Sequence, residues 1–112
     1  MLRGEIWTAV WPADPDKKER PVLVVSNNLR NQNGRLLDVV VAKITSAQKA
    51  DGSKKLVNLA EDVVMTLKKA SLIKCGSLFS IEKSTLQRKL QQLPPAQMKD
   101  VDAKLKVVLD LN

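Results

Sequence analysis

Two runs rich in Val and Leu constrain the fold of this chain more than any other feature. They cover Pro21–Ser26 and Leu37–Thr45. Such β-branched runs predict buried strands, and Pro21 suits the first position of a strand, where a missing N–H is tolerated. The polar stretch between the runs, Asn27–Arg35, contains the turn dipeptide Asn33-Gly34. The sequence therefore predicts two core strands with a polar connection.

Weaker patterns predict the other strands and the loops. Further strands are expected at Glu5–Val10, Leu56–Leu59 and Ser71–Ile81. The last of these contains Gly76, which predicts a bend or bulge at that point. Pro12–Glu19 and Gln48–Lys54 are charged or polar and are expected to be exposed loops. The pattern of Glu61–Lys69 fits a loop or a helix.

The last third of the chain changes to helical spacing. Leucines that predict a short helix after Lys83 stand at Leu86, Leu90 and Leu93. Pro94 ends this helix, and Pro95 suits the first turn of the next one. The apolar stripe of that second helix comprises Met98, Val101, Leu105, Val108 and Leu109. Strands first and helices last predict a single α+β domain over residues 1–112, with a barrel-like sheet.

The near absence of Cys and His limits the chemistry. Cys75 stands alone, so it can form neither an internal disulfide nor a structural zinc site, and with no His the usual metal ligand and general base are missing. No apolar run approaches the ~18–20 residues of a membrane span, and the N-terminus lacks the apolar core of a secretory signal. These features predict a cytoplasmic protein without metal, other cofactor or membrane contact.

The charge favours a polyanionic partner. Nineteen Lys and Arg against twelve Asp and Glu give a net charge of +7. Phosphates neutralised by such residues release counterions, although a basic, solvated surface would explain the charge equally well. The aromatic residues are Trp7, Trp11 and Phe79, too few for an extended base-stacking platform.

The order of several short motifs resembles the MazF/PemK family of bacterial toxins. These motifs are Arg3-Gly4-Glu5-Ile6-Trp7, Arg20 before the Pro21–Asn27 run, Thr45-Ser46 at a strand end, Ser80–Leu86, and Leu93-Pro94-Pro95. The resemblance runs through nearly the whole chain. It implies a small SH3-like β-barrel of the MazF/PemK/CcdB type with C-terminal helices packed on it. It also implies a ribosome-independent endoribonuclease, the toxin of a type II toxin–antitoxin pair.

RNA can be cut without metal or His if its 2′-hydroxyl is held in line with the adjacent phosphate and the developing charge is stabilised. A guanidinium suits this task because its planar fork donates two hydrogen bonds to one phosphate, and a hydroxyl can serve a second oxygen. Arg20, held by Pro21, and Thr45 occupy neighbouring strand ends. By resemblance they are the catalytic pair. Their alternative roles are a surface arginine and a threonine that caps a turn.

Other polar residues near these strand ends are candidates for RNA binding. They are Ser26, Asn27, Asn28, Ser46, Lys17, Lys18 and Lys43. The amide and hydroxyl groups could contact bases or sugars of single-stranded RNA, but Asn residues also close Asx turns at strand ends. Some of the lysines in or beside the flanking loops could guide the RNA backbone, although most lysines are simply solvated; these are Lys17, Lys18, Lys43, Lys49, Lys54 and Lys55.

Two departures from the family affect these expectations. Asp14–Glu19 replaces a glycine-containing loop that gates the substrate groove in many members, and Lys74–Phe79 lacks the acid and the arginine common there. Lys74 could replace a cationic group, but no auxiliary acid–base residue is assigned. Cys75 is expected to be a small buried residue, because no His is present to activate it.

The resemblance also implies the products and partners. Cleavage would be sequence-selective and metal-independent, leaving a 2′,3′-cyclic phosphate and a 5′-hydroxyl. The partners would be single-stranded RNA, a small acidic antitoxin and a second copy of the chain in a C2 homodimer. Leu78, Phe79 and the helix from Pro95 are candidates for the dimer contact, with Phe79 in its own core as the alternative. The alternative functions are a CcdB-like, non-catalytic toxin that binds DNA gyrase and an inactive member that only binds antitoxin.

Overall fold

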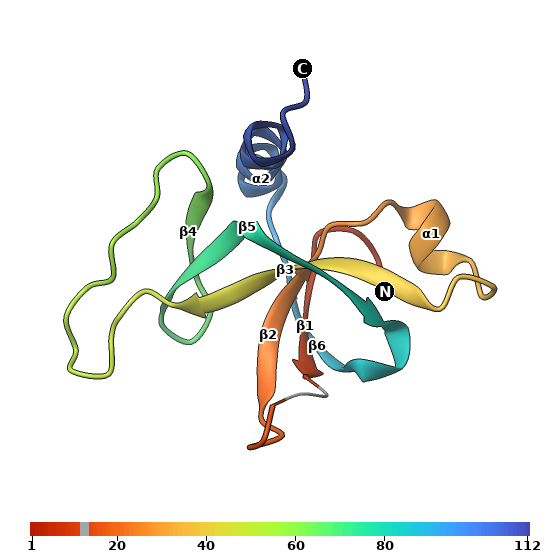
Figure 1. Ribbon diagram of the computed structural model, residues 1–112, viewed down its shortest axis with the longest axis horizontal. Helices are drawn as coiled ribbons and strands as arrows, with labels where there is room; N and C mark the ends of the chain where they lie inside the picture. The colour runs from red at the N-terminus through yellow and green to blue at the C-terminus, as the bar shows by residue number, and fades with distance from the viewer. Residues whose placement is uncertain (12–13) are drawn as a thin grey trace.

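In the computed structural model, residues 1–11 and 14–112 are described. The elements are β1 (Glu5–Val10), β2 (Glu19–Val24), α1 (Asn28–Gln32), β3 (Asp38–Ser46), β4 (Asp62–Thr66), β5 (Ala70–Glu82), the 3₁₀ turn η1 (Lys83–Thr85), β6 (Leu86–Gln92) and α2 (Pro95–Leu109). All six strands pair antiparallel in the order β4-β5-β3-β2-β1-β6. The sheet curls into a half-open barrel, with α2 beside β4 and β5 and α1 beside β3 (Figure 1). The predicted α+β, barrel-like fold is confirmed.

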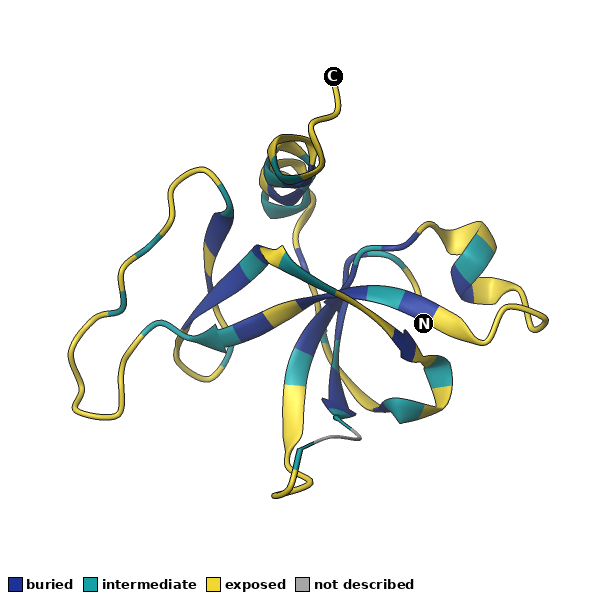
Figure 2. Cartoon of the chain, in the orientation of Figure 1, coloured by how far each residue is buried: buried dark blue, intermediate teal, exposed yellow. Residues whose placement is uncertain are grey.

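Both faces of the central strands are buried, which explains why their apolar runs do not alternate with polar residues. Leu23 and Ala42 face the core beneath α2, whereas their neighbours Val22, Val24 and Val41 face a second cluster on the other side of the sheet. Figure 2 shows these strands as mainly buried and the connecting loops as mainly exposed. The predicted strands at Pro21–Ser26 and Leu37–Thr45 are therefore confirmed in kind, each displaced by one or two residues.

The long strand β5 is bent at the predicted glycine. Ala42 pairs with Leu78 and the next residue, Lys43, pairs with Lys74, so three residues of β5 around Gly76 form a bulge. A Cβ at Gly76 would displace the carboxylate of Glu61. The bend lets β5 pair with β3 along both of its halves, which closes the sheet around a concave side.

The C-terminal helix begins as predicted, and its stripe packs on the sheet. Pro95 stands in the first turn of α2, and the helix ends at Leu109, where Asp110 caps it with a left-handed backbone. Val101 and Leu105 are buried, and Met98 and Val108 pack against the same cluster. Leu109, also predicted for the stripe, is 51% exposed instead. No helix in the described part of the chain is long and apolar enough to span a membrane.

Three predicted elements are wrong. Leu56–Leu59 lies in an extended loop, with Leu56 and Leu59 almost fully exposed, and the fourth strand is Asp62–Thr66, inside the segment Glu61–Lys69 that fitted a loop or a helix. The helix expected after Lys83 is a 3₁₀ turn followed by strand β6, so one helix, not two, packs at the C-terminus. Pairing with β1 overrides the helical spacing of the leucines there.

The polar connection between β2 and β3 contains a helix that the sequence did not predict. α1 covers Asn28–Gln32 within the expected turn region, and the side chain of Asn27 caps its first turn. In the predicted loop Pro12–Glu19, residues 12 and 13 lie outside the described residues.

Candidate active site

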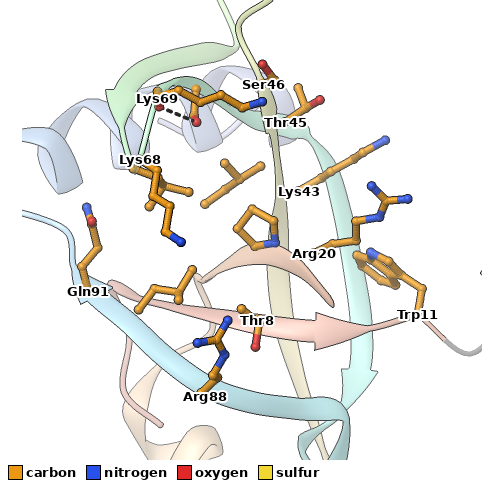
Figure 3. A pocket seen from close by; sticks show the side chains of 15 residues that line it. Thr8, Trp11, Arg20, Lys43, Thr45, Ser46, Lys68, Lys69, Arg88 and Gln91 are labelled. Carbon is orange, nitrogen blue, oxygen red and sulfur yellow. Dashed lines mark hydrogen bonds between the residues drawn. The ribbon is translucent and has the colours of Figure 1, made fainter. Parts of the chain in front are cut away.

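A cleft of about 860 Å³ opens on the concave side of the sheet. Its lining residues are Thr8, Trp11, Arg20, Pro21, Lys43, Ile44, Thr45, Ser46, Leu67, Lys68, Lys69, Ser71, Arg88, Leu90 and Gln91. They come from β1, β2, the end of β3, the β4–β5 hairpin and β6, so the cleft exists only because the sheet curls (Figure 3). Its volume lies in the range of ligand-binding sites.

The cleft is lined by positive charge. Five cationic side chains line it: Arg20, Lys43, Lys68, Lys69 and Arg88. No Asp or Glu is among the described residues that line it. A concave surface with one sign of charge raises the local concentration of oppositely charged ligands, so the cleft suits an anion. The cations are spread over several strands of the sheet, so the cleft suits a chain of phosphates better than a single phosphate.

Arg20 and Thr45 both line this cleft, Arg20 from β2 and Thr45 from β3 near its C-terminal end. Val22 pairs with Lys43, Leu23 with Ala42 and Val24 with Val41. The pairing ends at Val22 and Lys43; beyond it Arg20 pairs with Ala9 of β1 and Thr45 with Leu72 of β5. Both side chains line the cleft, on the same wall as Lys43 in Figure 3.

The guanidinium of Arg20 is held from one side. Its Nε lies 3.5 Å from Oδ2 of Asp14, whose side chain is only 13% exposed. Asp14 also accepts a hydrogen bond from the backbone N–H of Asp16, which ties it to the turn before β2. The Arg20 side chain remains 48% exposed, so it is oriented by Asp14 and still accessible from the cleft.

Thr45 presents its hydroxyl group at the end of β3. Its backbone pairs with Leu72 of β5, and its side chain is half-buried. Nζ of Lys55 donates a hydrogen bond of 2.9 Å to Thr45 Oγ1. Both groups expected to act on a phosphate, a guanidinium and a hydroxyl, are therefore present in one cleft, and each contacts a charged neighbour.

Three of the residues predicted to bind RNA lie outside this cleft. Ser26 is buried, donates to Asn31 and accepts from the backbone N–H of Val40. Asn27 caps α1 by accepting from Arg30 N–H, and Asn28 accepts from Arg3 N–H at 2.7 Å. Their polar groups hold the α1 turn in place. For the asparagines, closing a turn was the stated alternative to RNA binding.

The remaining predicted residues divide between the cleft and the loop before β2. Lys43 and Ser46 line the cleft beside Thr45. Lys17 and Lys18 are exposed and are not among the lining residues. The structure thus brings together Arg20, Lys43, Thr45 and Ser46.

Three cations of the cleft were not predicted. Lys68 and Lys69 form the tip of the β4–β5 hairpin, and Arg88 lies on β6, where its guanidinium is 3.4 Å from Glu19. All three belong to elements that the sequence patterns did not assign as strands. The pair Lys68-Lys69 between alternating apolar residues was the available signal for a hairpin with a basic tip.

The segment around the bulge of β5 is structural. Lys74 donates to Asp62 at 2.8 Å, and the side chain of Asp62 is 1% exposed, so Lys74 is committed to a buried partner and does not line the cleft. Burial, together with the nearby carboxylate of Asp62, raises the pKa of the Cys75 thiol to about 11, so the thiol stays protonated at neutral pH. Within the described ranges, no three His, Cys, Asp or Glu residues gather in a group that could hold a metal.

Comparison with known proteins places the chain in a family. Residues 2–109 match the family described as PemK-like, MazF-like toxin of type II toxin-antitoxin system. A search of the curated proteins gives no match.

Several solved structures share the fold. An endoribonuclease in complex with its cognate antitoxin from mycobacterial species gives a TM-score of 0.78 at 24% sequence identity, covering 100% of this chain and 97% of that one. The Mycobacterium tuberculosis toxin MazF-mt6 gives 0.75 at 23% identity, covering 96% and 98%. A MazE-MazF structure from Deinococcus radiodurans gives 0.77 at 17% identity, covering 100% and 98%.

Proposed function

We propose that this protein is an endoribonuclease whose cleft cuts single-stranded RNA. The chain belongs to the PemK-like, MazF-like toxins of type II toxin–antitoxin systems. The observation that carries the proposal is that Arg20 and Thr45 line the same basic cleft. Proteins of the same fold with 17–24% identity include endoribonucleases and a complex with an antitoxin. The proposed site of action is cytoplasmic RNA.

The proposed chemistry uses the RNA's own 2′-hydroxyl as the nucleophile. Its oxygen attacks the adjacent phosphorus in line with the departing 5′-oxygen, giving a 2′,3′-cyclic phosphate and a 5′-hydroxyl. Negative charge gathers on the phosphoryl oxygens in the transition state. The planar guanidinium of Arg20 donates hydrogen bonds to these oxygens, and the Thr45 hydroxyl group donates a hydrogen bond to one of them.

The other cations of the cleft are assigned to the RNA backbone. In Figure 3, Lys43 lies between Thr45 and Arg20 and the Lys69 side chain extends toward Thr45 and Ser46, whereas Lys68 and Arg88 lie on other parts of the cleft. Positive groups on more than one wall suit a substrate that extends along the cleft past the scissile phosphate. Leu67, Leu90 and Trp11 add apolar surface on which bases can rest.

The function is tested by incubating the purified protein with a long RNA and mapping the ends of the fragments. We expect cuts at a restricted set of sequences, each leaving a cyclic phosphate. Uncut RNA together with inhibited DNA gyrase would instead support a CcdB-like toxin. Uncut RNA, active gyrase and binding of an acidic antitoxin peptide would support an inactive member.

Chelation should leave the cleavage rate unchanged. The sequence contains no His, and the proposed mechanism assigns charge stabilisation to Arg20 and Thr45. The rate is measured with and without excess EDTA, alongside a magnesium-dependent nuclease as the positive control. Loss of activity in EDTA that added magnesium restores would contradict this mechanism.

The proposed partners are an acidic antitoxin and a second copy of the chain. An acidic segment would complement the cationic lining of the cleft and compete with RNA for it. Phe79 supports a self-contact, because it is 43% exposed and rests edge-to-face on Trp11, with ring centroids 4.9 Å apart, outside both core clusters. A half-exposed aromatic pair is typical of the apolar centre of an interface.

Light scattering at micromolar concentration should report about twice the chain mass of 12.4 kDa. Phe79→Asp should reduce the mass to that of one chain, since the carboxylate would be buried without a partner in a C2 interface. Leu56→Asp is the matched control, because Leu56 is 91% exposed in the loop before β4. A monomeric wild-type protein, or a Phe79→Asp dimer as stable as wild type, would contradict the expectation.

A further inference from the structure

The ammonium group of Lys55 lies against the hydroxyl group of Thr45. We propose that Lys55 is a positioning residue that fixes the direction in which Thr45 donates its hydrogen bond, an inference that rests on the proposed function. Lys55 does not itself line the cleft; it acts through Thr45, which does. Nothing in the proposed chemistry otherwise uses Lys55.

A tight hairpin after β3 delivers Lys55 to this position. Ala47 N–H donates to Ala70 of β5 and Ala47 C=O accepts from Lys55 N–H at 2.8 Å, so Lys55 is tied to the end of the sheet. Between them the chain turns at Gly52, which has a positive φ of 86°. The turn is closed by a hydrogen bond of 2.7 Å from Lys49 N–H to Ser53 C=O. The ammonium group therefore approaches Thr45 from a backbone that is itself hydrogen-bonded.

The chemistry of the two groups determines which of them donates. An ammonium group has three hydrogens and no acceptor, whereas a threonine hydroxyl has one hydrogen and two lone pairs. In the 2.9 Å contact Lys55 must be the donor and Thr45 Oγ1 the acceptor. One lone pair of the hydroxyl is then occupied, and its hydrogen stays available for a phosphoryl oxygen in the cleft. The positive charge of Lys55 also polarises that O–H bond, which strengthens its donation in the transition state.

The surroundings of Lys55 argue against a solvated surface lysine or a structural ion pair. Lys55 is half-buried, whereas its hairpin neighbours Lys49 and Lys54 are exposed. Of the ion pairs in the described part of the chain, none involves Lys55. By contrast, Lys74 is paired with the buried carboxylate of Asp62. Lys55 instead brings an uncompensated charge to a hydroxyl at the cleft.

The first experiment compares Lys55→Met with Lys54→Met on a fluorogenic RNA oligonucleotide that contains one mapped cut site. Both variants lose one positive charge from the same hairpin, so they share any effect on electrostatic steering. We expect kcat of Lys55→Met to fall about tenfold or more, as for the loss of one charge-assisted hydrogen bond in the transition state. KM should match that of Lys54→Met. A wild-type kcat in a folded Lys55→Met protein would overturn the proposal.

A double-mutant cycle separates positioning of Thr45 from any independent role of Lys55. In a Thr45→Ala background, single-turnover rates should change less than about twofold when Lys55→Met is added, because the group that Lys55 orients is gone. When Thr45 is present, Lys55→Arg should keep most of the kcat that Lys55→Met loses, since arginine keeps the charge and the hydrogen-bond donor. An equal fold-loss in both backgrounds would mean that Lys55 acts on RNA without Thr45.

The contact itself is tested without RNA by NMR of the lysine side-chain ammonium groups. The Lys55 signal is assigned by its absence in Lys55→Met. Thr45→Val, which replaces the hydroxyl by a methyl group of similar size, should shift this signal and leave that of Lys54 in place. An unmoved Lys55 signal would overturn the inference whatever the activity. If the wild-type protein cuts no RNA, the proposed function fails, while this measurement still decides whether Lys55 holds Thr45.

Discussion

Arg20→Ala should lower the rate of RNA cleavage by about 10²–10³-fold, the usual cost of removing one donor that stabilises charge in a transition state. The side chain is half-exposed and belongs to neither core cluster, so the fold should survive the change. The rate is measured under single-turnover conditions, and the far-UV circular dichroism and melting temperature of the variant establish that it is folded.

Two further variants make this result specific. Arg20→Lys keeps the charge but loses the planar fork, so it should recover only part of the rate. Arg35→Ala removes the same charge from an exposed loop outside the cleft and should cleave at the wild-type rate. A folded Arg20→Ala protein that cuts RNA as fast as wild type would contradict the assignment of the site.

That Arg20 and Thr45 line one cleft was predictable in outline, because each stands at an end of an apolar run that forms β2 or β3. The apolar runs mark both strands, and polar residues mark the ends of those runs. The strand arrangement that brings both residues to the same cleft cannot be derived from the sequence. It depends on hydrogen bonds such as the Val22–Lys43 pairing and on the burial of both sheet faces.

The other walls of the cleft were missed for a physical reason. In β6, Leu86 is buried while Leu90 lies at the cleft, and their helical spacing is overridden by pairing with β1. β4 is a five-residue edge strand, too short for its alternation to be distinguished from a loop or a helix turn. Because these two strands were not predicted, Lys68, Lys69 and Arg88 were not predicted to line the cleft either.

The polar cluster Ser26–Asn28 shows why residue types alone do not decide between binding and structure. Hydroxyl and amide groups at a strand end can contact a ligand or satisfy the backbone of the next turn, and the residue types alone do not distinguish these uses. Here the backbone N–H groups of Arg3, Arg30 and Val40 are bonded to Asn28, Asn27 and Ser26 respectively. Arg3 and Val40 come from distant segments, which only the folded structure reveals, whereas Arg30 lies in the turn that Asn27 caps.

Replacing a single ribonucleotide by its 2′-deoxy form should abolish cleavage when that nucleotide lies immediately 5′ to the cut. The proposed nucleophile is the 2′-oxygen of that nucleotide, and no side chain substitutes for it. The phosphates are unchanged, so the modified oligonucleotide should still bind the cationic cleft and inhibit cleavage of unmodified RNA.

The matched control carries the deoxy substitution on the nucleotide 3′ to the cut. That change removes one 2′-hydroxyl from the same substrate without removing the nucleophile, so cleavage should continue with at most a modest change in KM. Mass spectrometry of the products completes the measurement, because attack by the 2′-oxygen leaves a cyclic phosphate that is one water lighter than the product of direct hydrolysis. Suppose that the substrate whose 2′-deoxy nucleotide lies 5′ to the cut is cleaved at the normal rate. This result would show that water is the nucleophile. Arg20 and Thr45 would then have to stabilise a different transition state, with a proton acceptor for that water elsewhere in the cleft.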